Sequence, residues 1–137
     1  MEIKHNDFVI SDDKSLIPVD RVYEFLKTTY WAEKWITREI VALSIENSFC
    51  FGVYKDTALI GFARCITDYS TTYYLTDVVI DNNYRGQGLG KVLMKFITEH
   101  EMFSHLLGVT ETRDAHELYE KYGFTVSKGF AMRKDPR

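Results

Sequence analysis

The stretch Tyr84-Arg85-Gly86-Gln87-Gly88-Leu89-Gly90-Lys91 follows an extended apolar run and precedes a segment with helical hydrophobic spacing. Its three glycines let the backbone approach a ligand closely, because no side chain stands in the way. The positive end of the helix dipole adds about 0.3–1 kcal/mol for each favourable negative charge. The stretch therefore predicts an anion-binding loop, and phosphate groups are the usual ligands of such loops.

The spacing of the glycines excludes the Walker type of phosphate loop. That pattern needs a glycine five residues before the Gly-Lys pair and a Ser or Thr directly after it. The chain has Arg85 and Val92 at these two positions.

The dinucleotide-binding pattern G-x-G-x-x-G is a second alternative and stays open as the weaker one. The glycines here are spaced Gly86-x-Gly88-x-Gly90, but Glu111 lies about 20 residues further on, where a ribose-binding acid is expected. A dinucleotide-binding fold normally begins with this loop and continues with further βα units. Only residues 91–137 follow the loop, which leaves little room for them.

Length and composition are typical of one soluble globular domain. The chain has 137 residues, of which 45% are apolar and 27% charged, and we expect residues 1–137 to form a single domain. A net charge of −3 argues against a general nucleic-acid binder. The first residues lack the apolar run of a signal peptide, and no stretch resembles a membrane span. We therefore expect a cytoplasmic protein with neither nucleic acid nor membrane as partner.

The cysteines and histidines give no support for a metal site. Cys50 and Cys65 fall inside strand-like runs without C-x-x-C spacing, so buried thiols are expected rather than a disulfide. Neither cysteine has a base partner in a recognisable motif, which disfavours a covalent cysteine route. The four histidines show no metal-ligand spacing.

Hydrophobic periodicity divides the chain into short strands and amphipathic helices. The pattern predicts strands over residues 7–11, 49–54, 59–67, 72–80 and 105–110, helices over 18–28, 38–45, 88–101 and 114–122, and closing strands over 124–126 and 129–132. Thr37 is the predicted N-cap of the second helix. The three strands over 49–54, 59–67 and 72–80 should pair as an antiparallel meander that ends at the glycine loop. The loop, its helix and the strand over 105–110 then form a β-α-β unit, whose crossover should be right-handed and parallel.

Two local motifs in this order resemble the GNAT acyltransferase superfamily. The loop matches the pattern R-x-x-G-x-G at Arg85, Gly88 and Gly90, and the segment 115–124 is similar to the family's A-x-x-x-Y-x-K-x-G-F helix. The resemblance covers nearly the whole chain. It implies an α+β fold with a mixed, mostly antiparallel sheet, a central parallel strand pair splayed for acetyl-CoA, and about four flanking helices.

The resemblance also implies which residues contact acetyl-CoA. The strand ending at Val78, Val79 and Ile80 would offer backbone groups to the pantetheine arm. Thr112 stands where many relatives carry Asn, so its contact with the pantetheine is the weakest of these assignments. The pyrophosphate would lie on the loop residues Arg85, Gly86, Gln87, Gly88, Leu89, Gly90 and Lys91.

Tyr119 matches the tyrosine that in many family members protonates the departing CoA thiolate. A thiolate with a parent pKa of roughly 8.5 leaves more easily beside a phenol near 10 that donates a hydrogen bond. Tyr122 is the competing candidate, because it lies three residues further along the same helix. His116 lies within one turn of Tyr119 and is expected to be a surface residue.

No recognisable sequence motif identifies the acetyl acceptor. An amine nucleophile needs a base or a water chain, and Asp68, Asp77 and Glu111 are unranked candidates for that base. Tyr30 and Trp31 lie where family members commonly build the acceptor wall, and aromatic rings there can bind an amine by cation–π contact.

The resemblance implies an N-acetyltransferase that moves the acetyl group from acetyl-CoA directly to a primary amine of a small molecule or peptide. No metal is expected, and homodimer formation is left open. The alternative from another class is an acetyl-CoA-binding sensor or interaction module without catalysis.

Overall fold

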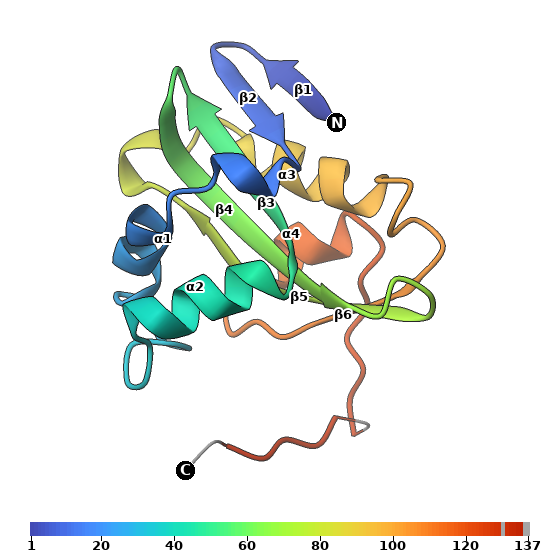
Figure 1. The fold of residues 1–137 in the computed structure, drawn as a ribbon. Helices are drawn as coiled ribbons and strands as arrows, with labels where there is room; N and C mark the ends of the chain where they lie inside the picture. The colour runs from blue at the N-terminus through green and yellow to red at the C-terminus, as the bar shows by residue number, and fades with distance from the viewer. Residues whose placement is uncertain (130, 136–137) are drawn as a thin grey trace.

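The computed structural model describes residues 1–129 and 131–135 as one twisted mixed sheet with helices on both faces (Figure 1). Six strands lie in the order in which the chain makes them. No helix among the described residues is long and apolar enough to cross a membrane. The strands are β1 (Glu2–His5), β2 (Phe8–Ser11), β3 (Phe49–Lys55), β4 (Ala58–Thr67), β5 (Thr72–Ile80) and β6 (Leu107–Thr110); the helices are α1 (Val19–Leu26), α2 (Arg38–Glu46), α3 (Leu89–Thr98) and α4 (His116–Glu120), with short 3-10 turns η1 (Lys14–Leu16) and η2 (Asn82–Tyr84).

The predicted helices, and the predicted strands between residues 7 and 110, are confirmed with small shifts at their ends. β1 was not predicted, because its alternating residues are mostly exposed and carry no core signal. Thr37 is the predicted N-cap of α2, and its hydroxyl accepts a hydrogen bond from the Ile40 N–H over 3.2 Å. α4 is shorter than the predicted 114–122, because Thr112 and Asp114 form a turn before it and Gly123 has a φ of +93° after it.

Alternate side chains of the central strands pack into two separate cores, one on each face of the sheet. On one face, Phe51 of β3 packs with the apolar sides of α3 and α4. On the other face, Cys50 and Phe62 pack under α1 and α2. Each side chain placed in these cores contributes about 1.5–3 kcal/mol by leaving water, so the sheet is held as a rigid platform between the helices.

β5 and β6 are parallel, as predicted, but they separate halfway along β5. Residues Thr72 to Leu75 pair with Leu107 to Thr110, and beyond Leu75 the strand continues to Ile80 without a β6 partner. The strand bends at this point, because Asp77 has a φ of +56° and the β4–β5 register shifts between Phe62 and Arg64. The backbone on the β6 side of residues 76–80 is therefore open.

The parallel pair lies at the edge of the described sheet rather than at its centre. The predicted closing strand over 124–126 is wrong: Phe124 packs its ring against Tyr119 at 5.8 Å between centroids, and Val126 stays exposed. The second closing strand, over 129–132, includes Phe130, which lies outside the described residues. β6 consequently forms the sheet edge beside the split.

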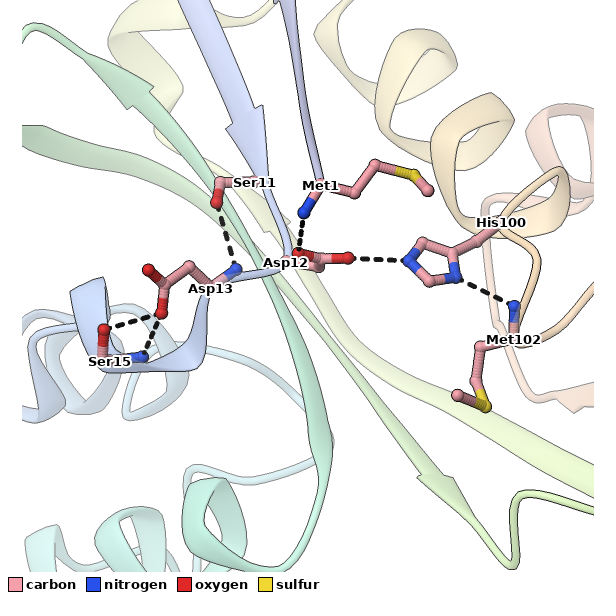
Figure 2. Close-up of polar contacts among 7 residues, drawn as sticks. All are labelled: Met1, Ser11, Asp12, Asp13, Ser15, His100 and Met102. Carbon is pink, nitrogen blue, oxygen red and sulfur yellow. Dashed lines mark hydrogen bonds and ion pairs between the residues drawn. The ribbon is translucent and has the colours of Figure 1, made fainter.

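A polar cluster joins the N-terminal hairpin of β1 and β2 to the segment that directly follows α3 (Figure 2). The Asp12 carboxylate accepts hydrogen bonds from the Met1 amino group over 2.9 Å and the His100 ring over 2.7 Å. The Nδ1 atom of His100 accepts from the Met102 N–H over 3.1 Å, which leaves Nε2 to donate to Asp12. The N-terminal hairpin and the segment after α3 thus hold one another in place.

Candidate active site

The split between β5 and β6 opens into a cleft of about 1350 Å³. Its walls come from four parts of the chain: the end of α1 with the segment after it, the unpaired half of β5, the glycine loop, and the β6–α4 connection with α4 itself. The cleft thus gathers segments that are far apart in the sequence. The cleft is lined by Tyr119, by Tyr30 and Trp31, and by every residue assigned above to acetyl-CoA except Gln87.

The glycine loop lies at one end of the cleft with its backbone donors free. Gly86 and Gly88 have φ values of +83° and +77°, and a Cβ built on either would meet no atom within 4 Å. Among residues 1–129 and 131–135, no hydrogen-bond acceptor faces the backbone N–H groups of Gln87 to Lys91. Leu89 is buried and anchors the start of α3. A loop with free donors, open space and two nearby cations, Arg85 and Lys91, suits a pyrophosphate.

The unpaired half of β5 forms the long wall of the cleft. Val78, Val79 and Ile80 are half-buried, and on the β6 side no strand within residues 1–129 and 131–135 pairs with them. Across the split, the Thr110 hydroxyl donates to the Leu75 carbonyl over 2.9 Å and closes the paired end. The Thr112 hydroxyl accepts from the Ala115 N–H over 2.9 Å, so part of its hydrogen-bonding capacity goes to the turn before α4.

Tyr119 reaches the cleft from α4 and is largely buried. Burial raises the pKa of its phenol and nearby Tyr30 adds to the rise, while a hydrogen bond with Thr110 opposes it. The phenol is therefore protonated at neutral pH. Tyr122 and His116 do not line the cleft, which favours Tyr119 among the candidates for the acid.

The three candidate bases have different environments. Both oxygens of the buried Asp77 carboxylate are occupied: Trp31 Nε1 donates over 2.8 Å and Arg64 Nε over 2.9 Å. Asp68 lies outside the cleft in the β4–β5 turn, where hydrogen bonds from the turn backbone lower its pKa far below the usual range. Glu111 is exposed, lines the cleft, and has an oxygen 3.5 Å from Arg133.

Tyr30 and Trp31 bridge the two sides of the split. Their rings meet edge to face at 4.9 Å between centroids. Trp31 binds Asp77 on β5, whereas the Tyr30 hydroxyl accepts from the Arg113 N–H of the β6–α4 connection over 3.0 Å. The predicted acceptor wall therefore stands across the opening of the split, beside Tyr119.

Arg64 and Arg113 are residues of this region that sequence reasoning missed. Arg64 lies inside a strand pattern, and its pairing with Asp77 depends on the bend in β5, which no local signal predicts. Arg113 lies directly after Thr112, next to the recognised helix motif, and its stacking on Tyr30 depends on a contact between residues 83 positions apart. Only the proximity of Arg113 to that motif could have drawn attention to it.

The two cysteines are free buried thiols, as predicted. Burial raises the pKa of Cys50 to about 11, and burial likewise raises the pKa of Cys65. Neither thiol is suited to act as a nucleophile at neutral pH. Within the described part of the chain, no group of His, Cys, Asp and Glu side chains could hold a metal ion.

Comparison with known families matches residues 14–124 to the model of the acetyltransferase (GNAT) family. The chain belongs to this family. The resemblance inferred from the two motifs is thereby confirmed, and GNAT members use acetyl-CoA as acetyl donor.

Relatives and solved structures agree with this assignment. The chain is 34% identical over 99 residues to the uncharacterised N-acetyltransferase ycf52 of Gracilaria tenuistipitata var. liui, covering 66% of this chain and 54% of that protein. It is 30% identical over 88 residues to the streptothricin acetyltransferase of Escherichia coli, covering 61% and 51%. The chain thus spans about half the length of the curated relatives it matches. A GNAT-family structure from Xanthomonas campestris pv. campestris aligns with a TM-score of 0.88 and 35% identity, covering 98% of this chain and 96% of that one.

Proposed function

We propose that this protein is an acetyl-CoA-dependent N-acetyltransferase that passes the acetyl group directly to a primary amine of a small molecule or peptide. The observation that carries the proposal is the single cleft in which the phosphate-type loop, the open edge of β5 and the protonated Tyr119 phenol lie together. Acetyl-CoA supplies the activated acetyl group. Residues of the cleft bind acetyl-CoA and transfer the protons of the reaction.

Different parts of the cleft bind different parts of acetyl-CoA. At one end, the free N–H groups of Gln87 to Lys91 bind the pyrophosphate oxygens, and the positive end of α3 favours that charge. Along the wall, residues 78–80 offer unpaired backbone groups to the amides of the pantetheine arm. These contacts direct the thioester toward Tyr119 and the bend at Asp77.

The proton balance assigns a role to Tyr119. The amine attacks the thioester carbonyl and loses a proton, while the carbon–sulfur bond breaks and the sulfur leaves with the electron pair. Tyr119 donates its phenolic proton to that sulfur and regains one from water. Glu111 is the candidate base with the freest access to the cleft, directly or through a water.

The proposal is tested by ligand-induced stabilisation followed by turnover. We expect acetyl-CoA to raise the melting temperature, whereas NAD and ATP at the same concentration do not. Release of CoA should then depend on added amine, measured over a panel of small amines, peptides and amino sugars. Stabilisation by NAD or ATP but not by acetyl-CoA would refute the assignment, and binding of acetyl-CoA without release for any amine would favour the non-catalytic sensor.

A further inference from the structure

One cation of the cleft outside the glycine loop has no acidic partner. Arg113 lines the cleft and forms no ion pair with any residue in the ranges 1–129 and 131–135. The other arginines in or beside the cleft that do not belong to the glycine loop pair with carboxylates: Arg21 with Asp81, Arg64 with Asp77, and Arg133 with Glu111 and Asp135. The charge of Arg113 is therefore available to a ligand.

Arg113 is held in a defined position although it is exposed. The guanidinium carbon of Arg113 lies 3.7 Å from the centre of the Tyr30 ring. The backbone N–H of Arg113 donates to the Tyr30 hydroxyl over 3.0 Å. Stacking of this kind leaves the edge of the planar guanidinium free to donate two parallel hydrogen bonds. Because the side chain is already ordered, binding a ligand costs less conformational entropy.

Arg113 stands at the end of the cleft where the acetyl group is transferred. Tyr30, on which it stacks, is close enough to Tyr119 to influence the titration of that phenol. Tyr30 also contacts Trp31, which binds Asp77 at the bend of β5. Arg85 and Lys91 belong instead to the glycine loop at the phosphate end, so the cleft has separate cationic groups for its two ligands.

Resting on the function proposed above, we propose that Arg113 binds a carboxylate of the acetyl acceptor, so that the acceptors are small primary amines that carry a carboxylate. A guanidinium matches the two oxygens of a carboxylate with two parallel N–H donors. A phosphate dianion is usually bound by several cations and backbone donors, whereas the arginines closest to the acceptor end besides Arg113 are paired: Arg64 with Asp77 and Arg133 with Glu111. Asp114 also lines the cleft beside Arg113, which disfavours a doubly charged anion.

The test compares acceptors that differ only in the acidic group. Glycine, β-alanine and γ-aminobutyrate are each assayed beside their carboxamides, with rates expressed per neutral amine, and phosphoethanolamine is assayed beside ethanolamine. CoA release is measured for the wild type, Arg113→Gln and Arg113→Lys. Arg38→Gln serves as the control, because Arg38 is an arginine on α2 that pairs with Asp20 outside the cleft.

We expect the wild type to prefer the carboxylate member of at least one pair by roughly 10-fold or more in kcat/KM, the size of a charge-assisted hydrogen-bonded contact. Arg113→Gln should abolish this preference through a raised acceptor KM, Arg113→Lys should restore part of it, and Arg38→Gln should keep it. Affinity for acetyl-CoA should be unchanged in all three variants.

Four results would overturn the inference. Equal use of acids and carboxamides, or a stronger preference for phosphoethanolamine, would refute a carboxylate acceptor. A weakened affinity of Arg113→Gln for acetyl-CoA would place Arg113 at the donor instead. If acetyl-CoA binds but no amine of either kind releases CoA, the proposed function itself fails, and this inference fails with it.

Discussion

Tyr119 and Tyr122 lie three residues apart at α4, yet only Tyr119 lines the cleft. The helix motif shared with the family pointed to Tyr119, and burial of its phenol is consistent with the role of an acid. Asp77 shows the opposite outcome. Its position near a strand end suggested a base, but Arg64 and Trp31 occupy both of its oxygens. The sequence identifies such residues by type, whereas only the fold decides what each carboxylate contacts.

Replacing Tyr119 by Phe should lower kcat by about 10²–10⁴-fold, the usual contribution of a general acid. The melting temperature and the affinity for acetyl-CoA should change little, because the ring keeps its packing. The matched control is Tyr122→Phe, which removes a phenol at α4 that does not line the cleft and should keep full activity. Full kcat in folded Tyr119→Phe would exclude this residue as the acid.

Replacing Trp31 by Phe tests the acceptor wall. The change leaves one oxygen of the buried Asp77 carboxylate without its donor, which should cost about 1–3 kcal/mol of unfolding free energy. It should also raise the acceptor KM more than the KM for acetyl-CoA, because the wall loses its attachment to β5. Trp35→Phe is the control in the same segment: Trp35 is exposed, lies outside the cleft, and should have no effect on either quantity.

At the scale of elements, the order of strands and helices could be predicted, and the split between β5 and β6 could only be implied by resemblance. Alternation of apolar residues locates β3, β4 and β5, because each strand packs side chains into a core on both faces. The bend at Asp77 needs a positive φ at a non-glycine residue, which carries no sequence signature. The prediction of a closing strand over 124–126 was wrong because Phe124 packs on Tyr119 instead of pairing with a neighbouring strand.

The glycine loop can be tested by adding one methyl group. Gly88→Ala should weaken acetyl-CoA binding, because a left-handed φ of +77° costs a non-glycine residue about 1–2 kcal/mol and the Cβ enters space assigned to the phosphates. Gly129→Ala is the matched control, since Gly129 has a φ of +81° but lies outside the cleft. Affinity is measured by calorimetric titration with acetyl-CoA. Unchanged affinity of Gly88→Ala would contradict the placement of the phosphates.

At the scale of the whole molecule, the cleft depends on elements that come together from both ends of the chain. The hairpin of β1 and β2 is joined to the end of α3 by Asp12, Met1 and His100, none of which carries a recognisable motif (Figure 2). α3 in turn begins at the glycine loop. The helix that begins at the glycine loop is thus fixed at its other end by this contact, which sequence patterns could not predict because Asp12 and His100 are 88 residues apart.

This cluster predicts an acid-dependent loss of stability. Burial alone would raise the pKa of Asp12, but hydrogen bonds from the Met1 amino group and His100 lower it overall. The stability it provides is therefore present above the unfolded-state pKa of an aspartate and is lost as the pH falls through the lower folded-state pKa. Asp12→Asn should lose about 1–2 kcal/mol at pH 7 and less in acid.

Chemical denaturation of the wild type and Asp12→Asn from pH 7 down to about pH 3 measures the difference in their free energies of unfolding. Asp13→Asn provides the control, because Asp13 is exposed and its carboxylate accepts hydrogen bonds from Ser15 within the turn. If the unfolding free energies of Asp12→Asn and the wild type differ by the same amount at every pH, the charge of Asp12 does not contribute to stability.

The most direct test of direct acetyl transfer in this cleft is a single-turnover experiment with labelled acetyl-CoA, read by mass spectrometry of both protein and amine. Because Cys50 and Cys65 are buried and their pKa values are raised, we predict that the label passes to the amine at the rate at which CoA appears, with no acetylated protein at any time. An acetylated protein that forms and decays before the product, or CoA release without a labelled amine, would contradict direct transfer.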